Sequence, residues 1–259
     1  MKLHVEEVGQ ENSETIVFLH EASLAGWMWK EQVKSFKDYH LIIPDLPEHG
    51  KSANIKPFAI KTAAGLVINI IKTLAHHQEA HLVGVGMGGQ LVLEIMDRAP
   101  ELVGSAMISG VQTSPHTETL LELLDYTLNA YKPVKDSDFF IKARMRTYNI
   151  SKTYRKDFRE STRQINSDSL KRVLHESMLF QISPRLKGVD APVLLVLGGK
   201  EYKVVKKSAE NLMKVVPEIE VLKIPEIGHI WNLENPELFN RILRSWITNE
   251  VLNQDLNCF

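Results

Sequence analysis

The chain has a single cysteine among its 259 residues, Cys258, which is the next-to-last residue. One thiol cannot form a disulfide within the chain, so a disulfide framework is excluded and a reducing, cytoplasmic location is expected. Long apolar runs are also absent. The stretch MKLHVEEVGQE at the N-terminus lacks the apolar core of a signal peptide, and no segment is long enough to span a bilayer. We therefore expect neither a signal peptide nor a membrane partner.

An excess of charge of either sign is missing as well. The chain has 31 basic and 32 acidic residues, which gives a net charge of −1. Such a balance provides no bulk attraction for nucleic acid or for an anionic membrane. Hydrophobic residues make up 44% and charged residues 24%, values that are ordinary for a globular protein. The length suits one large α/β domain, or one domain with an insertion. A small molecule is the expected partner.

Short β-rich runs alternate with amphipathic helical patterns along most of the chain. Residues 2–8 form a candidate edge strand, and the stronger strand candidates are residues 15–19, 40–44, 81–83, 106–109, 192–197 and 220–224. Apolar residues recur at helical spacing between them, for example over residues 61–76, about 206–215 and about 236–251. This alternation predicts a mostly parallel sheet with helices on both faces.

The alternation stops between about residues 113 and 187, where only helical patterns occur. We interpret residues 113–187 as a helical cap inserted into a core made of residues 1–112 and 188–259. Several arginines in this stretch, including Arg144 and Arg172, fit a solvated helix face better than an anion site.

The most informative stretch is residues 79–101, EAHLVGVGMGGQLVLEIMDRAPE. A short apolar strand leads into a glycine-rich turn, and a helical pattern follows. Strand, turn and helix in this order are the context of a nucleophile elbow, whose pattern is Gly-x-Ser-x-Gly. Residues 84–88 keep that frame, but Gly86 stands in the position of the serine. Glycine tolerates the strained backbone of such a turn and offers no nucleophile.

A dinucleotide-binding loop is the alternative for the same glycines, since residues 84–89 also fit Gly-x-Gly-x-x-Gly. That motif should open the first βαβ unit and be followed by an acidic residue near the end of the next strand. Two strand patterns precede this turn, and the next strand ends without a carboxylate. The dinucleotide interpretation is therefore disfavoured.

Loops at the carboxyl ends of parallel strands meet at one edge of a sheet, where ligands bind. Those loops contribute Gly86, Glu201 and His229 in chain order, which is the order nucleophile, acid, histidine of the α/β-hydrolases. The sequence resembles that superfamily over essentially its whole length. The matching stretches are residues 84–88, the loop DLPEHGKS at 45–52, the strand end at 197–201 and the pair Gly228-His229. The run GWMW at 26–29 is similar to that of small bacterial esterase-like members with a helical cap.

The resemblance implies roles for individual residues. His229 would be the general base and Glu201 would orient its imidazole, although the lysines around Glu201 leave a merely solvated carboxylate open. The backbone N–H groups of Ala22 and Met87 would be the oxyanion donors by position. We expect a pocket between cap and core beside the Gly86 turn and His229, with Glu21 and Trp27 in its wall. The resemblance implies no cofactor and no metal. Asp45 and His49 would stabilise the turn that contains them.

Two departures from the family pattern fall in the same site. Gly86 replaces the nucleophile, and Glu21 follows His20 where the family has glycine. A carboxylate at Glu21 that points toward the oxyanion hole would repel the developing oxyanion. Two departures together favour natural divergence over one introduced change.

Three functions remain open. The first is an esterase or acyl-hydrolase lineage that has lost its serine. The second is a non-catalytic protein that binds a small ligand. The third is serine-independent acid–base chemistry by His229 with Glu21 or Glu201.

Overall fold

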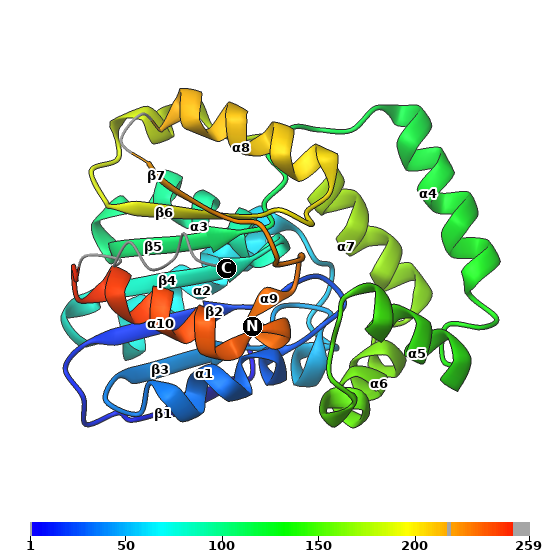
Figure 1. Cartoon of the computed structure of the whole chain (residues 1–259), viewed down its shortest axis with the longest axis horizontal. Coiled ribbons are helices and arrows are strands. Elements are labelled where there is room, and N and C mark those ends of the chain that lie inside the picture. Colours follow the sequence, from blue (N-terminus) through cyan, green and yellow to red (C-terminus); the bar gives the residue numbers. More distant parts are fainter. Residues whose placement is uncertain (1, 217–218, 251–259) are drawn as a thin grey trace.

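The computed structural model describes residues 2–216 and 219–250, and within them a seven-stranded sheet forms the centre of the molecule (Figure 1). The strands are β1 (Val5–Val8), β2 (Thr15–Leu19), β3 (His40–Pro44), β4 (Ala80–Val85), β5 (Val103–Ser109), β6 (Val193–Gly198) and β7 (Glu220–Ile224). Their order is β1-β3-β2-β4-β5-β6-β7. Strand β1 pairs antiparallel with β3, and the other neighbours are parallel. The predicted α/β class with a mostly parallel sheet is confirmed.

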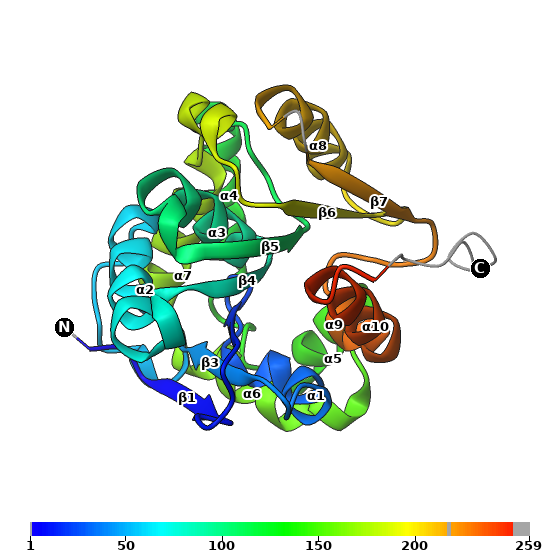
Figure 2. The same cartoon turned by 90° about the vertical axis from the view of Figure 1, so that its left-hand side faces the viewer.

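The central strands are apolar on both faces because helices cover both. In β2, Val17 and Leu19 belong to one hydrophobic cluster, and Ile16 and Phe18 to the other, as the two-residue period of a strand requires. Helices α2 and α3 pack on the first face, and α1 and α10 on the second (Figure 2). The core helices are α1 (Lys30–Ser35), α2 (Ile60–Leu74), α3 (Met87–Arg98), α8 (Lys203–Val215), α9 (Trp231–Glu234) and α10 (Pro236–Ile247).

The stretch between β5 and β6 contains helices and no strand, as predicted. Its helices are α4 (Glu118–Tyr131), α5 (Asp138–Thr147), α6 (Arg155–Gln164) and α7 (Ser167–Leu179), and they gather on one side of the sheet in Figure 1. Two arginines tie them to loops of the sheet domain. Arg144 of α5 donates to Ser23 Oγ at 3.0 Å, and Arg172 of α7 pairs with buried Glu48. Helices α5 and α7 therefore sit against the loops that follow β2 and β3.

Three helix boundaries differ by two residues or more from the sequence prediction. Helix α2 ends at Leu74 instead of residue 76. Helix α8 begins at Lys203, three residues before the expected start. Helix α10 ends at Ile247 instead of Val251, because Asn249 has the left-handed φ of 52° that stops a helix. Val251 and Cys258 lie outside the described residues.

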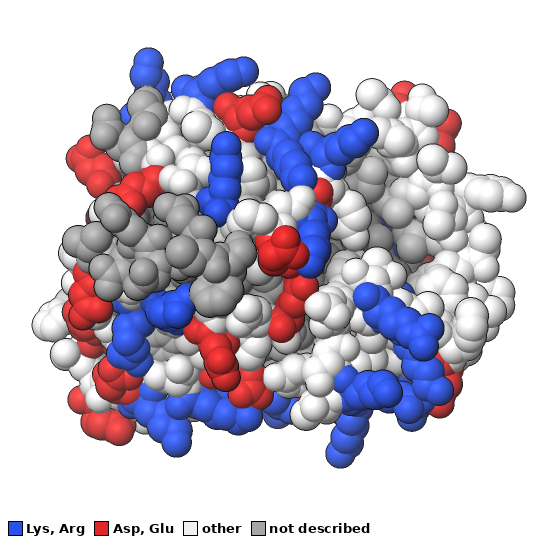
Figure 3. Space-filling view, in the orientation of Figure 1, with Lys and Arg blue, Asp and Glu red and all other residues white. Residues whose placement is uncertain are grey.

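Charged side chains of both signs are interspersed on the face shown in Figure 3. On that face the acidic and basic side chains do not separate into one acidic and one basic patch.

Candidate functional site

The turn between β4 and α3 is sharp, and Gly86 at its centre carries no side chain. Gly86 has φ 55° and ψ −115°, and α3 begins at the next residue, Met87. This conformation is strained for any residue that carries a Cβ atom. Gly88 allows close packing in the same turn, because a Cβ there would lie 2.0 Å from the carbonyl oxygen of Leu19. The glycines thus fix both the backbone of the turn and the approach of α3 to β2.

The carboxylate of Glu21, from the loop after β2, fills the space beside Gly86. A Cβ built on Gly86 would lie 1.5 Å from Glu21 Oε2 and 2.4 Å from its carboxyl carbon. The first distance is close to a covalent bond length, so the two groups cannot coexist. Gly86 and Glu21 are therefore a complementary pair, in which the carboxylate occupies the space of the missing side chain.

Backbone N–H groups hold this carboxylate in place. Glu21 Oε2 accepts a hydrogen bond of 2.7 Å from Met87 N, at the N-terminus of α3, where the helix dipole favours negative charge. Burial raises the pKa of the Glu21 carboxyl above its ordinary value, while the nearby charge of His229 and the N–H groups of Met87 and Ala22 act in the opposite direction. The two N–H groups expected to serve as oxyanion donors thus already stabilise an anion that belongs to the protein.

His229 and Glu201 meet beside this carboxylate. His229 Nδ1 lies 3.0 and 3.1 Å from the two carboxylate oxygens of Glu201. The side chain of Glu201 is 1% exposed, so it is not a solvated charge. Glu201 follows β6 and His229 follows β7, at the strand ends where the sequence predicted them. The second imidazole nitrogen, Nε2, lies 3.9 Å from Glu21 Oε2.

Electrostatics in this group favour a charged imidazole. Burial alone would lower the pKa of His229, but the hydrogen bond to Glu201 and the charges of Glu21 and Glu201 outweigh it and raise the pKa to about 8. Near neutral pH, His229 is therefore a cation between two carboxylates. Glu21 and His229 are 17% and 14% exposed at their side chains, so solvent reaches part of each side chain.

Two buried histidines fix the loop that carries Glu21. His20 donates from Nδ1 to the carbonyl oxygen of Glu21 and accepts from Leu46 N at Nε2, both at 2.9 Å. His49 accepts from Ser23 N at 3.1 Å. Burial lowers the pKa of His20 to about 4 and that of His49 to about 3, so both rings are neutral near pH 7. These contacts position the loop without taking part at the carboxylate.

Asp45 stabilises its turn as expected. Its carboxylate accepts hydrogen bonds from the backbone N–H groups of Gly26 and Lys51, both at 2.8 Å. Asp45 thereby joins the loop after β3 to the loop after β2, which contains Glu21.

Two tyrosines at the site were not anticipated from the sequence. The rings of Tyr148, at the end of α5, and Tyr202 lie 6.5 and 5.7 Å from the imidazole of His229, measured between centroids. Tyr202 directly follows Glu201, so its proximity could have been inferred. Tyr148 gives no such signal, because its position depends on how α5 packs against the sheet domain.

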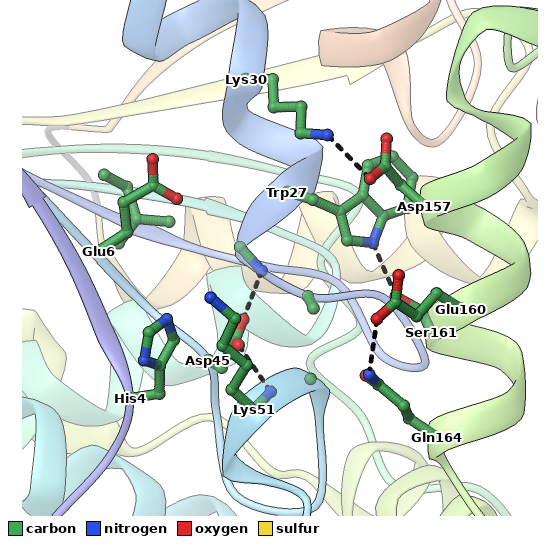
Figure 4. Close-up of a pocket in the computed structure, with 14 residues that line it drawn as sticks. His4, Glu6, Trp27, Lys30, Asp45, Lys51, Asp157, Glu160, Ser161 and Gln164 are labelled. Carbon is green, nitrogen blue, oxygen red and sulfur yellow. Dashed lines mark hydrogen bonds and ion pairs between the residues drawn. The ribbon is translucent and has the colours of Figure 1, made fainter.

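The side chain of Trp27 contacts helix α6. Its indole Nε1 donates to Ser161 Oγ of α6 at 2.7 Å, and it lines a cavity of about 220 Å³ (Figure 4). Lys30, Asp45 and Asp157 also line this cavity, whereas Glu21, Gly86 and His229 do not. This cavity does not include the Glu21 site, so a pocket shared by Trp27 and Glu21 remains a prediction.

Within residues 2–216 and 219–250, no group of three or more His, Cys, Asp or Glu side chains is arranged to hold a metal ion. No helix in the same ranges combines the length and the apolar character needed to cross a membrane.

Comparison with known proteins agrees with the fold. Residues 16–242 match the sequence model described as the alpha/beta hydrolase family. The chain belongs to this family. An alpha/beta hydrolase superfamily protein of Gibberella zeae is 24% identical over 246 residues, which cover 92% of this chain and 82% of that protein. A carboxylesterase of Bacillus subtilis is 24% identical over 264 residues, 96% of this chain and 86% of the relative.

A thermophilic esterase from Thermogutta terrifontis has a solved structure that superposes with a TM-score of 0.78 at 17% identity. The match covers 96% of this chain and 93% of the esterase. This likeness concerns the fold. As a family member, the chain has relatives named as hydrolases and esterases, and the dinucleotide interpretation of the glycine turn is superseded.

Proposed function

We propose that the chain is an enzyme of hydrolase lineage that acts on a small molecule without a serine nucleophile. In this proposal Glu21 and His229 are the reacting groups, and Glu201 orients the imidazole. One observation carries the proposal: Glu21 Oε2 lies 1.5 Å from the position of the Cβ that Gly86 lacks. A charged oxygen therefore stands close to where the serine oxygen of the family would be, next to the histidine that would serve it.

Serine-type ester hydrolysis does not fit this arrangement. It needs a hydroxyl at position 86 and free N–H donors for the oxyanion of the substrate. Glu21 occupies the space of a side chain at position 86, and it already accepts the hydrogen bond of the Met87 donor. The carboxylesterase relative supports hydrolytic chemistry on small molecules as the ancestry, while Glu21 and Gly86 indicate a different reacting group.

We also propose that residues 113–187 act as a cap over the site. Arg144 reaches Ser23, two residues beyond Glu21, and Tyr148 lies beside His229. Side chains of this stretch would then select the substrate.

Ligand binding without catalysis is the second candidate. The hydrogen bond from Met87 N to Glu21 Oε2 favours it. A carboxylate bound to Met87 N resembles a bound anionic product and closes the site to another anion. Under this alternative His229 would only pair with the two carboxylates.

The test is turnover of a panel of small esters, lactones, epoxides and alkyl halides by four proteins: wild type, Glu21→Gln, His229→Gln and the surface control Glu11→Gln. If the proposal holds, wild type and Glu11→Gln turn over the same compound at the same rate, and a serine-directed fluorophosphonate does not inhibit them. Each site variant should lose about 10²–10⁴-fold, the usual contribution of a positioned acid or base. Full activity in Glu21→Gln would contradict the proposal, and saturable binding of a panel compound without turnover would support the second candidate.

A further inference from the structure

We propose that helices α4 and α5 form a surface that binds a second copy of this chain in a twofold symmetric dimer. Helix α4 of each copy packs on α5 of the other, so that one kind of contact is made twice and the assembly closes. The α4–α5 surface is defined as the exposed side chains of Glu118–Tyr131 and Asp138–Thr147. The inference is independent of the proposed function, because neither Glu21 nor His229 takes part in it.

Large apolar side chains that face solvent are concentrated in this part of the chain. Leu123, Tyr126 and Phe139 are 58%, 74% and 81% exposed, and Leu120 is exposed as well. Outside residues 120–139, only three large apolar side chains in the described part of the chain are exposed to a similar degree. Single apolar residues are ordinary on a protein surface, whereas several together mark a site of interaction.

Helix α4 has one packed side and one open side. On the packed side, Asp125 forms ion pairs with Lys171 and His175 of α7. No residue of α4 is fully buried, although the helix has 14 residues, a length that is only marginally stable in water without packing. The exposed Leu123 and Tyr126 lie on the open side. A second helix packed there would bury them and stabilise α4.

The open sides of α4 and α5 lie at one end of the molecule. The end of α4 meets the start of α5, where the rings of Tyr131 and Phe140 are 4.4 Å apart between centroids. Both helices lie at the margin of the molecule, away from the sheet (Figure 1). A second copy can therefore approach them without meeting the helices that cover the sheet.

The two helices carry charges of opposite sign. Helix α4 has three acidic residues and neither Lys nor Arg. On α5, the exposed Lys142 and Arg146 follow Phe139 by three and seven residues, so they share its face of the helix. Figure 3 shows basic side chains over α5 and α6 and little colour over α4. An acidic and apolar helix thus lies beside a basic and apolar one.

This difference in charge favours a second copy as the partner. When α4 packs on α5 of another copy, Glu122 lies opposite Lys142 and Arg146, and Leu123 packs against Phe139. The twofold axis repeats these contacts, so both copies have their charges paired and their apolar side chains covered. An anionic membrane would attract α5 but would be repelled by the acidic residues of α4.

Sedimentation equilibrium of the full chain tests the proposal. Two short helices form a smaller interface than a standard one, so the dimer should dissociate at micromolar concentrations. Wild type is therefore measured between about 1 and 300 µM at low salt, together with Leu123→Arg and the control Met213→Arg. Met213, on α8, is 48% exposed and lies outside the surface. Wild type and the control should dimerise with the same Kd, and Leu123→Arg should raise it at least about tenfold.

Exchange of charges tests the pairing of α4 with α5. Glu122→Lys faces basic residues of the other copy, and Lys142→Glu/Arg146→Glu faces an acidic one. Each variant alone should therefore have a Kd about tenfold higher than wild type. In an equimolar mixture both contacts between the two variants are attractive, so the mixture should dimerise about as tightly as wild type. Cooperative urea unfolding of every variant checks that it is folded.

Three results would overturn the proposal. The first is a monomer at every concentration up to about 300 µM, or equal association of wild type and Leu123→Arg. The second is a mixture of the charge variants that associates no more tightly than either variant alone. The third is a monomeric wild type that binds vesicles of phosphatidylcholine and phosphatidylserine and loses this binding in Phe139→Ser, which would assign the surface to a membrane.

Discussion

Restoring serine at position 86 should be costly in the natural background and much less costly when Glu21 is removed. In wild type, Gly86→Ser places a Cβ 1.5 Å from Glu21 Oε2, so the carboxylate must leave its hydrogen bond with Met87 N. Loss of a hydrogen bond to a charged group costs about 1.5–3 kcal/mol. A side chain at the positive φ of Gly86 adds about 1–3 kcal/mol of backbone strain. In the Glu21→Gly background only the strain remains.

The two substitutions should therefore couple by about 1.5–3 kcal/mol, the contribution of the displaced carboxylate. Urea unfolding of wild type, both single variants and Gly86→Ser/Glu21→Gly measures this coupling directly, since the cost of Glu21→Gly itself cancels in the cycle. Independent sites add within about 0.3–0.5 kcal/mol. If Gly86→Ser costs the same in both backgrounds within that margin, the carboxylate does not occupy the space beside Gly86.

The same proteins allow a catalytic comparison. Serine at position 86 would return a nucleophile beside His229, but a displaced Glu21 would still disturb the donors at Ala22 and Met87. One lost oxyanion donor costs about 2.7–4 kcal/mol, or 10²–10³ in kcat. The double variant should hydrolyse activated esters faster than Gly86→Ser by about that factor. Equal kcat/KM for the two would show that Glu21 does not affect the oxyanion donors.

Three further results are expected. Wild type should hydrolyse p-nitrophenyl acetate no faster than His229→Ala, because loss of a serine nucleophile costs roughly six orders of magnitude in the serine protease template; a burst of p-nitrophenol would contradict this. In the folded protein the pKa of His20 is about 4 and that of His49 about 3, below the ordinary value of about 6.5. The free energy of unfolding should therefore fall as pH drops below about 6.5, by up to about 1.4 kcal/mol per pH unit for each histidine. The fall should be less steep in His49→Gln. Arg172→Met should lower the free energy of unfolding, measured in urea, by about 2–4 kcal/mol. This is somewhat less than for a fully buried pair, because the Arg172 side chain is 37% exposed while Glu48 is buried. A loss below about 1 kcal/mol would refute this.

The fold could be predicted from sequence because its signals are local and repeat along the chain. Apolar runs such as residues 15–19 and 40–44 are buried on both faces, and helical periodicity marks the elements between them. Glu201 and His229 were placed correctly because each follows a strand of the parallel sheet, and strand ends converge whatever the details of packing.

The position of the Glu21 side chain could not be predicted in the same way. The sequence shows that a carboxylate stands where the family has glycine, and it leaves open whether that carboxylate points into the site. Its direction depends on contacts distant in sequence: Met87 N donates to the carboxylate itself, and His49 and Asp45 hold the backbone of the same loop at Ser23 and Gly26. From the sequence we expected Glu21 to repel the oxyanion of a substrate. In the structure, the oxygen of Glu21 itself accepts the hydrogen bond from Met87 N.

Tyr148 and Trp27 are two further side chains whose positions the sequence did not predict. Tyr148 lies next to His229 because of the way α5 packs, and no spacing in the sequence reveals this. Trp27 belongs to a run that matches esterase-like members, yet its indole turns toward Ser161 and a separate cavity. Resemblance locates the backbone of such residues better than the direction of their side chains.

The central claim, that the Glu21 carboxylate and the His229 imidazole share one site, is tested most directly by an NMR titration of His229. The imidazole signal is assigned by comparison with His229→Gln and followed in wild type, Glu21→Gln and the control Glu11→Gln. We expect a pKa of about 8 in wild type and in the control, because Glu21 and Glu201 stabilise the imidazolium. In Glu21→Gln the pKa should be lower, since a negative charge 3.9 Å from Nε2 is gone. An identical His229 pKa in wild type and Glu21→Gln would contradict the shared site.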